Sequence, residues 1–228
     1  MSNIPEGPRP LAGIHNFGWV VPGSLARGEQ PPLDPDTFEA LAREGIGTVL
    51  SLRQDGEPAR GFTMAQGAYA GADEAEHCRA AGLRFCQVGC TDYQAMLPDR
   101  LAAALRTIDE EALAGRPVFV HCSAGVGRST LVAGAWFIAH GGAATEMARV
   151  HIAFVEERTL RMQIAPGDLA EYARRVGRAQ SWWSFLEIAR ALGDPVIELP
   201  SFPAPEAPSS AGELVAGYEG ELRPWRRQ

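Results

Sequence analysis

Lysine is absent from the 228-residue chain, whose 21 basic residues are all arginine. This absence excludes the enzyme classes that need a lysine in the site: Walker-type phosphate loops, Schiff-base enzymes and pyridoxal enzymes. The formal net charge of −7 argues against a broad nucleic-acid-binding surface, so we expect no nucleic-acid partner. A local site for an anion is still compatible with this composition.

Cysteine and long apolar runs are also scarce. Four cysteines are too few for a disulfide scaffold in a chain of this length. No apolar run reaches the roughly 20 residues of a membrane span. The N-terminal segment has Pro and Gly where a signal peptide would have its apolar stretch. We therefore expect a cytoplasmic protein with no membrane partner.

Predicted strands and helices alternate along most of the chain. Apolar segments bounded by Gly or Pro predict strands within 17–31, where a Pro-Gly turn separates two of them, and at 47–52, 84–90 and 117–122. Helical spacing predicts helices within 34–46, 72–83, 97–116 and 129–140. Asp36 or Thr37 is the expected cap of the first helix, and Asp99 that of the third. The pattern is typical of an α/β domain in which helices flank a mostly parallel central sheet.

The ends of the chain differ in character from its middle. Residues 1–15 are predicted to be an N-terminal arm. Residues 16–180 form the predicted domain, which includes two further helices at 144–158 and 166–179. Residues 181–228 read as a C-terminal extension with a short amphipathic docking helix, a Pro-rich linker and a tail.

The stretch PVFVHCSAGVGRST, residues 117–130, carries the chemistry. A buried strand leads to Cys122, and a helix begins near Arg128. The residues between them are small, so that successive N–H groups can point inward and bind an anion: Ser123, Ala124, Gly125, Val126 and Gly127. The helix dipole and Arg128 would stabilise a Cys122 thiolate, and the planar fork of Arg128 can clamp two oxygens. Ser129 can donate a hydrogen bond to the sulfur. The stretch therefore predicts a phosphate-binding loop beneath a cysteine nucleophile.

Phosphoryl transfer to a thiolate also needs a proton donor for the leaving group. Asp92 follows the predicted 84–90 strand and lies 30 positions before Cys122. Asp99 is the second candidate, but its place at a helix start suggests a capping role. We favour Asp92.

HCSAGVGRST resembles the signature loop of the cysteine-dependent protein tyrosine phosphatase superfamily. From residue 16 to about 178 the chain is similar to the small atypical dual-specificity phosphatases. The resemblance rests on NFGWVVPGSLARGEQP, LAREGIGTVLSLRQ, the spacing from Asp92 to Cys122 and the LAEYARRV segment. It implies a phospho-cysteine intermediate on Cys122, hydrolysed by water with Asp92 as base, and neither a metal nor another cofactor.

The sequence departs from the family pattern in places. Ser129 and Thr130 stand where the family usually has Thr-Gly, which keeps a hydroxyl. Asp168 stands where a glutamine is common, which bears on the hydrolytic step. Relatives that act on inositol phosphates tend to carry lysines in the loop, whereas this chain has Ala124 and Val126.

These features predict a phosphatase of phosphorylated proteins that acts on phosphotyrosine, with phosphoserine and phosphothreonine secondary. Two alternatives stay open: a phosphatase of a non-protein phosphate, such as an inositol phosphate or an RNA 5′ end, and a non-catalytic phosphate-binding module. The sequence leaves the oligomeric state open.

Several other residues have competing interpretations. We expect His121 to order the loop through hydrogen bonds rather than act as a base. Arg53, at the end of VLSLR, could face the substrate, but a solvated charge is favoured. Cys90 could be a redox partner of Cys122. Zinc ligation by His77 and the remaining cysteines is disfavoured, because their spacing fits no compact knuckle.

Overall fold

A six-stranded sheet forms the centre of the computed structural model, which describes residues 6–58, 68–92 and 96–140. The strand order is β1-β2-β3-β6-β4-β5. The strands are β1 (Arg9–Leu11), β2 (Ile14–Val21), β3 (Leu25–Gly28), β4 (Thr48–Ser51), β5 (Arg84–Gln87) and β6 (Val118–His121). β3, β6, β4 and β5 are parallel, whereas β1 and β2 add to one side as antiparallel strands.

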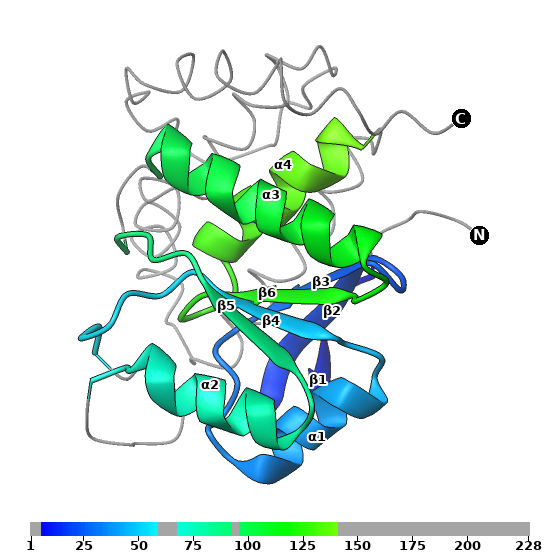
Figure 1. Cartoon of the computed structure of the whole chain (residues 1–228), viewed down its shortest axis with the longest axis vertical. Coiled ribbons are helices and arrows are strands. Elements are labelled where there is room, and N and C mark those ends of the chain that lie inside the picture. Colours follow the sequence, from blue (N-terminus) through cyan, green and yellow to red (C-terminus); the bar gives the residue numbers. More distant parts are fainter. Residues whose placement is uncertain (1–5, 59–67, 93–95, 141–228) are drawn as a thin grey trace, which may run out of the picture.

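Four helices cover the two faces of this sheet (Figure 1). They are α1 (Pro35–Arg43), α2 (Gly71–Ala80), α3 (Pro98–Leu113) and α4 (Arg128–Ala139). In Figure 1, α1 and α2 lie on one side of the sheet, and α3 and α4 lie on the other. The α/β class with a largely parallel sheet flanked by helices is therefore confirmed.

Alternating strand residues supply the two hydrophobic cores. Leu50 and Val120 pack in a cluster with residues of α3 and α4, such as Leu105. Their neighbours along the strands, Val49 and Phe119, pack in the other cluster with residues of α1 and α2. Because successive side chains of a strand point to opposite faces, a strand with helices on both sides must be apolar throughout.

The parallel register brings four loop starts to one edge of the sheet. Gly28 at the end of β3 and Ser51 at the end of β4 both pair with His121 at the end of β6. Ser51 also pairs with Gln87 at the end of β5. The segments that follow these four residues therefore begin side by side.

The start of the chain and the starts of α1 and α3 differ from the sequence-based expectations. Residues 9–11, inside the predicted N-terminal arm, form β1, which pairs with β2. The cap of α1 is neither Asp36 nor Thr37 but Asp34, whose Oδ1 accepts a 2.9 Å hydrogen bond from Thr37 N. Pro35 then takes the first helical turn, where its missing N–H costs nothing.

Asp99 does not cap α3. The N-cap is Leu97, and Pro98 precedes Asp99 in the helix, so Asp99 lies in the first turn with a largely exposed side chain. Its carboxylate lies 3.9 Å from Arg100 Nε. An acidic residue in this position still interacts favourably with the helix dipole.

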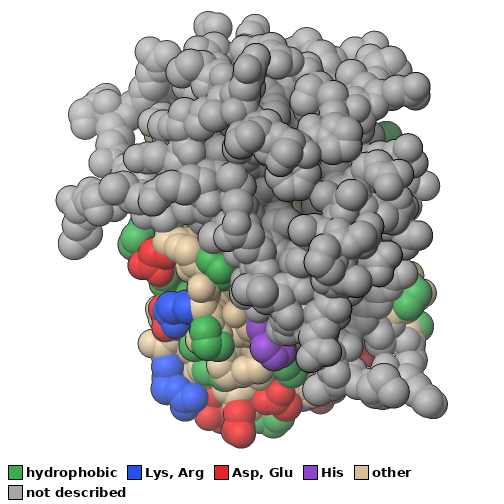
Figure 2. Space-filling model, turned by 180° about the vertical axis from the view of Figure 1, so that it is seen from behind, with side chains coloured by type: hydrophobic (Ala, Val, Ile, Leu, Met, Phe, Trp, Pro, Cys, Tyr) green, Lys and Arg blue, Asp and Glu red, His purple; other side chains and the backbone are tan. Residues whose placement is uncertain are grey.

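Some predictions fall outside the described residues. They are the helices at 144–158 and 166–179, Asp168, and the extension from 181 onward. Within the described ranges, no helix is both long and apolar enough to cross a membrane. Acidic and arginine side chains are interspersed on the visible described surface (Figure 2).

The α1 cap gives a direct test of the local structure. Asp34→Ala removes the acceptor for Thr37 N, and we expect it to lower the free energy of unfolding by about 1 kcal/mol. Asp36→Ala, at an exposed position in the same turn, should change it by no more than about 0.5 kcal/mol. Urea denaturation of both variants measures the difference, and equal losses would contradict the assignment of the cap.

Candidate active site

Cys122 follows β6 directly and lies at the edge where the parallel strands end. Its side chain is buried, and its Sγ lies 3.5 Å from the hydroxyl of Ser129 in the first turn of α4. Among the described residues, the backbone N–H groups of residues 123 to 127 donate no hydrogen bond. A row of unpaired N–H groups before a helix N-terminus is a site for an anion.

Residues of β2 and of the segment after β3 hydrogen-bond to the carbonyls of this loop. The side-chain amide of Asn16 donates to Ala124 O at 2.9 Å, and Gln30 N donates to Ser123 O at 3.2 Å. Asn16 is fully buried, and its Oδ1 accepts from Glu29 N at 2.7 Å. The carbonyls of Ser123 and Ala124 are therefore occupied. Sequence reasoning missed Asn16, because no short-range pattern relates it to a loop 108 positions away.

Gly125 makes this close approach possible. Its φ is +69°, and a Cβ there would lie 2.4 Å from Glu29 N and 2.5 Å from Gly28 C. Both of these are backbone atoms, which cannot move aside independently. Gly127, two residues on, has open space around its own Cβ position.

Arg128 reaches back from the start of α4 across the ends of β4 and β5. Its Nη1 donates to Leu52 O at 3.2 Å and to Cys90 O at 2.7 Å. Its Nη1 and Nη2 also face the two carboxylate oxygens of Glu57, at 2.5 and 3.0 Å. Burial opposes the charge of Arg128, but the hydrogen bonds to Glu57 and the negative charges nearby raise its pKa above the ordinary value. The guanidinium stays charged.

One nitrogen of this guanidinium is left over. Among the described residues, the buried Nε of Arg128 has no hydrogen-bond partner. A buried N–H group without a partner is costly. Together with the unpaired loop N–H groups, it points to an oxyanion as the ligand of this site.

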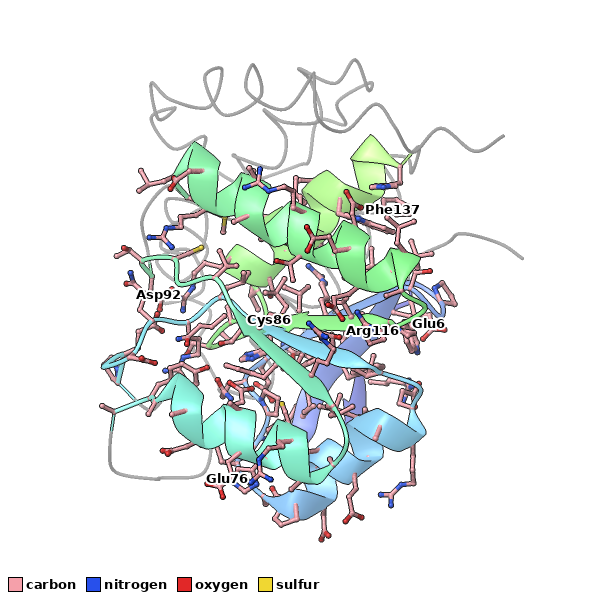
Figure 3. The ribbon with its side chains drawn as sticks, viewed as in Figure 1. Glu6, Glu76, Cys86, Asp92, Arg116 and Phe137 are labelled. Carbon is pink, nitrogen blue, oxygen red and sulfur yellow. The ribbon has the colours of Figure 1, made fainter. Side chains whose placement is uncertain are left out.

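Asp92 lies on the loop after β5, at the same end of the sheet (Figure 3). Its Oδ1 is 3.4 Å from Arg128 Nη2, and its side chain is one-third exposed. The structure thus brings Asp92, Arg128, Cys122 and Ser129 together. The rival Asp99 pairs instead with Arg100 on α3.

The favoured reading of Arg53 as a solvated charge is wrong. Its side chain is 2% exposed, and its Nε lies 3.2 Å from Glu57 Oε2. Its guanidinium also stacks over the ring of Tyr69, at 4.3 Å from the centroid. Arg53 and Glu57 both follow the end of β4, which was the one sequence signal that could have placed them here. A solvated charge at a strand end gives the same local pattern, so tertiary contacts had to decide.

His121 is fully buried between the loop and α2. Its Nδ1 lies 3.3 Å from Cys122 O, and its Nε2 lies 2.9 Å from Glu74 Oε1. Glu74 also accepts a 2.6 Å hydrogen bond from the hydroxyl of Tyr69. Burial disfavours the Glu74 charge, but His121 and these hydrogen bonds hold its pKa below the ordinary value. These contacts match the expected loop-ordering role of His121.

Cys90 is buried, and its Sγ contacts Val88 O at 3.3 Å. Burial raises its pKa to about 11, although Arg128 opposes the shift. A redox role for Cys90 stays a prediction. Within the described residues, no three His, Cys, Asp or Glu side chains are grouped as they would be around a metal ion.

The family described as PTP-SAK, the Swiss Army Knife protein DSP-PTPase phosphatase domain, matches residues 14–174, more than half of the chain. The chain belongs to this phosphatase family. It is thus an atypical dual-specificity phosphatase-like member of the cysteine-dependent tyrosine phosphatase superfamily, as the signature loop had suggested.

Solved structures are similar at a lower level. A putative phosphatase from Shewanella putrefaciens CN-32 is 19% identical with a TM-score of 0.46, over 65% of this chain and 94% of that one. P. aeruginosa TpbA, in a complex with phosphotyrosine, is 18% identical with a TM-score of 0.48, over 85% and 98%. The PP-IP phosphatase Siw14 of S. cerevisiae is 16% identical with a TM-score of 0.48, over 76% and 100%.

The two loop glycines provide a matched pair of variants. Gly125→Ala forces a Cβ into the backbone of Gly28 and Glu29, and we expect a loss of about 2 kcal/mol or more in the free energy of unfolding. Gly127→Ala should be neutral or slightly stabilising, because nothing lies within 4 Å of its Cβ. Chemical denaturation of both proteins tests this, and a harmless Gly125→Ala would contradict the described loop.

Proposed function

We propose that the protein is a phosphatase of phosphorylated proteins, which hydrolyses phosphotyrosine and, secondarily, phosphoserine and phosphothreonine. The proposal rests on one observation. Among the described residues, the loop that joins Cys122 to the buried Arg128 keeps the N–H groups of residues 123–127 open, and the Nε of Arg128 has no hydrogen-bond partner. A tetrahedral oxyanion above a thiolate satisfies both sets of donors.

In the first step, the Cys122 thiolate attacks phosphorus, so that a P–S bond forms while the P–O bond to the substrate breaks. The loop N–H groups and Arg128 stabilise the charge that spreads over the phosphoryl oxygens. Asp92 donates its proton to the departing oxygen. The 3.4 Å separation between Asp92 Oδ1 and Arg128 Nη2 supports this assignment.

In the second step, water attacks the phospho-cysteine, the P–S bond breaks and inorganic phosphate leaves. Asp92, now ionised, accepts a proton from the attacking water. The Ser129 hydroxyl, 3.5 Å from the sulfur, can donate a hydrogen bond to the thiolate as it departs.

The charges around the loop support a substrate with a single phosphoryl group. Two arginines, Arg53 and Arg128, face two carboxylates, Glu57 and Asp92. The side chains between Cys122 and Arg128 carry no charge. A polyphosphorylated ligand such as an inositol phosphate would need a surplus of positive charge, and these residues do not supply one.

A substrate panel with a Cys122→Ser control tests the proposal. We expect turnover of phosphotyrosine peptides, slower turnover of phosphoserine peptides and little with inositol phosphates or RNA 5′ phosphates. Cys122→Ser should abolish turnover but still bind vanadate, because the binding loop is made of backbone groups. In wild-type protein, vanadate should inhibit in competition with substrate. EDTA should leave the rate unchanged. Preference for inositol phosphates would replace the protein substrate, and residual turnover by Cys122→Ser above a few per cent would remove the nucleophile assignment.

The general acid is tested by a pair of aspartate variants. Asp92→Asn should lower kcat by about 10²–10⁴-fold and remove the alkaline limb of the pH–rate profile. The defect should shrink for activated aryl phosphates, whose leaving groups need no proton. Asp99→Asn, at an exposed position on α3, should leave the profile unchanged. The opposite pattern would transfer the role to Asp99.

A further inference from the structure

Thr130 stands where the family usually has glycine, and the reaction proposed above gives it no task. It lies in the first turn of α4, and its side chain is fully buried. Its hydroxyl donates to Val126 O at 2.8 Å and accepts a hydrogen bond from Arg27 Nη1. A hydroxyl has a single hydrogen to donate, so a donor on one side directs that hydrogen toward the partner on the other side.

Arg27 is a fully buried donor that comes from β3. It pairs in the sheet with Val120 of β6, two positions before Cys122. Burial lowers the pKa of the Arg27 guanidinium to about 9, although the negative charge of Cys122 opposes the shift. The group is therefore charged at neutral pH, and a charged guanidinium can donate but not accept. Its contact with Thr130 leaves the hydroxyl hydrogen for Val126 O.

The Val126 carbonyl belongs to the same peptide unit as the Gly127 N–H, which is one of the open groups of the loop. Among the backbone hydrogen bonds of the described residues, none ends on Val126 O, so the Thr130 side chain holds it. The peptide bonds within the described ranges are trans. Because a trans unit is planar, its C=O and N–H point in opposite directions. The hydroxyl that holds Val126 O therefore also sets the direction of the Gly127 N–H.

Packing alone does not select this direction. A Cβ on Gly125 would lie 2.4 Å from Glu29 N, so neighbouring backbone confines that part of the loop. Gly127 has nothing within 4 Å of its Cβ position. Glycine also adopts both signs of φ readily, so the unit between Val126 and Gly127 can rotate unless a hydrogen bond holds it. Thr130 provides that hydrogen bond.

We propose that Thr130 is a positioning residue, whose hydroxyl holds the Val126 carbonyl so that the Gly127 N–H faces the phosphoryl group; this rests on the function proposed above. Arg27 sets the direction of that hydroxyl. With the unit rotated, a carbonyl oxygen would face the anion and repel it. A donor that is already oriented costs no reorganisation when the anion binds. A glycine at position 130 has no hydroxyl, so the usual family residue could not make this contact.

Oxyanion binding tests this role directly. The probe is inorganic tungstate, a tetrahedral dianion, titrated by calorimetry into Cys122→Ser protein with and without Thr130→Val. Valine has nearly the shape of threonine but no hydroxyl, and tungstate affinity should fall about tenfold, the loss expected for one charge-assisted hydrogen bond. Thr130→Ser keeps the hydroxyl and should keep most of the affinity. Unchanged affinity in the Thr130→Val protein would overturn the proposal.

Thr48→Val is the matched control. Thr48 is also a fully buried threonine bound to a charged group, because its hydroxyl donates to Glu111 Oε2 at 2.6 Å. Glu111 pairs with Arg116, which lies at the opposite end of the sheet from Asp92 (Figure 3). Thr48→Val should lower thermal stability and leave tungstate affinity unchanged. Equal weakening of tungstate binding by both valine variants would mean a general loss of structure and would overturn the assigned role.

The Gly127 amide reports whether Thr130 acts through it. In NMR spectra of Cys122→Ser protein labelled isotopically at glycine, the Gly127 amide resonance should move when tungstate is added, and Gly127→Ala identifies that resonance by its loss. Thr130→Val should shrink the movement. An equal movement in both proteins would contradict the proposal.

Where Thr130→Val does not fold, Thr130→Ala removes the same hydroxyl without placing a methyl group beside the guanidinium, and it should weaken tungstate binding likewise. Because binding is the readout, these outcomes hold even if wild-type protein hydrolyses none of the phosphate esters, a result that would end the proposed function alone. Turnover of phosphotyrosine peptides together with unchanged tungstate affinity in the Thr130 variants would end the positioning role alone.

Discussion

The buried guanidinium of Arg128 is the constraint on which the candidate site depends. It joins three segments that are distant in sequence: the turn after β4 through Glu57, the loop after β5 through Cys90 O and Asp92, and the start of α4. A buried arginine is stable only where its charge and hydrogen bonds are matched, and removal of one partner of such a pair is strongly destabilising. Among the described residues, the same contacts leave the Nε–H of Arg128 without a partner.

The parallel sheet explains why these segments meet. Four parallel strands end at one edge, and each is followed by residues that take part in the site or support it. β6 delivers Cys122, β4 leads to Glu57, and β5 leads to Asp92. The end of β3 packs its backbone against Gly125 so closely that any side chain there would clash. The register of the parallel strands brings these segments to one edge, where Arg128 joins them.

Two carboxylates hold the two ends of the loop of residues 123–127. Glu74 on α2 pairs with His121 just before the loop, and Glu57 pairs with Arg128 just after it. Each is kept ionised by hydrogen-bond donors that outweigh the cost of burial. The loop is thus fixed at both termini, while its own N–H groups stay open. Preorganised donors of this kind need no rearrangement as charge develops on a bound phosphoryl group.

Much of the molecule was determined by the sequence on its own. Apolar periodicity located the parallel strands and the four helices, because burial between two layers requires it. The stretch from Cys122 to Arg128 indicated the family and predicted an anion-binding loop, because loop chemistry is local.

Only the tertiary structure decided where a helix begins and which residues a charge pairs with. Asp34, rather than Asp36, caps α1, since several adjacent residues have capping side chains and only the backbone geometry selects one. Arg53 was read as solvated and Glu57 was overlooked. An ion pair across 71 positions has no periodicity, and only the tertiary structure, by aligning the ends of parallel strands, brings its two charges together.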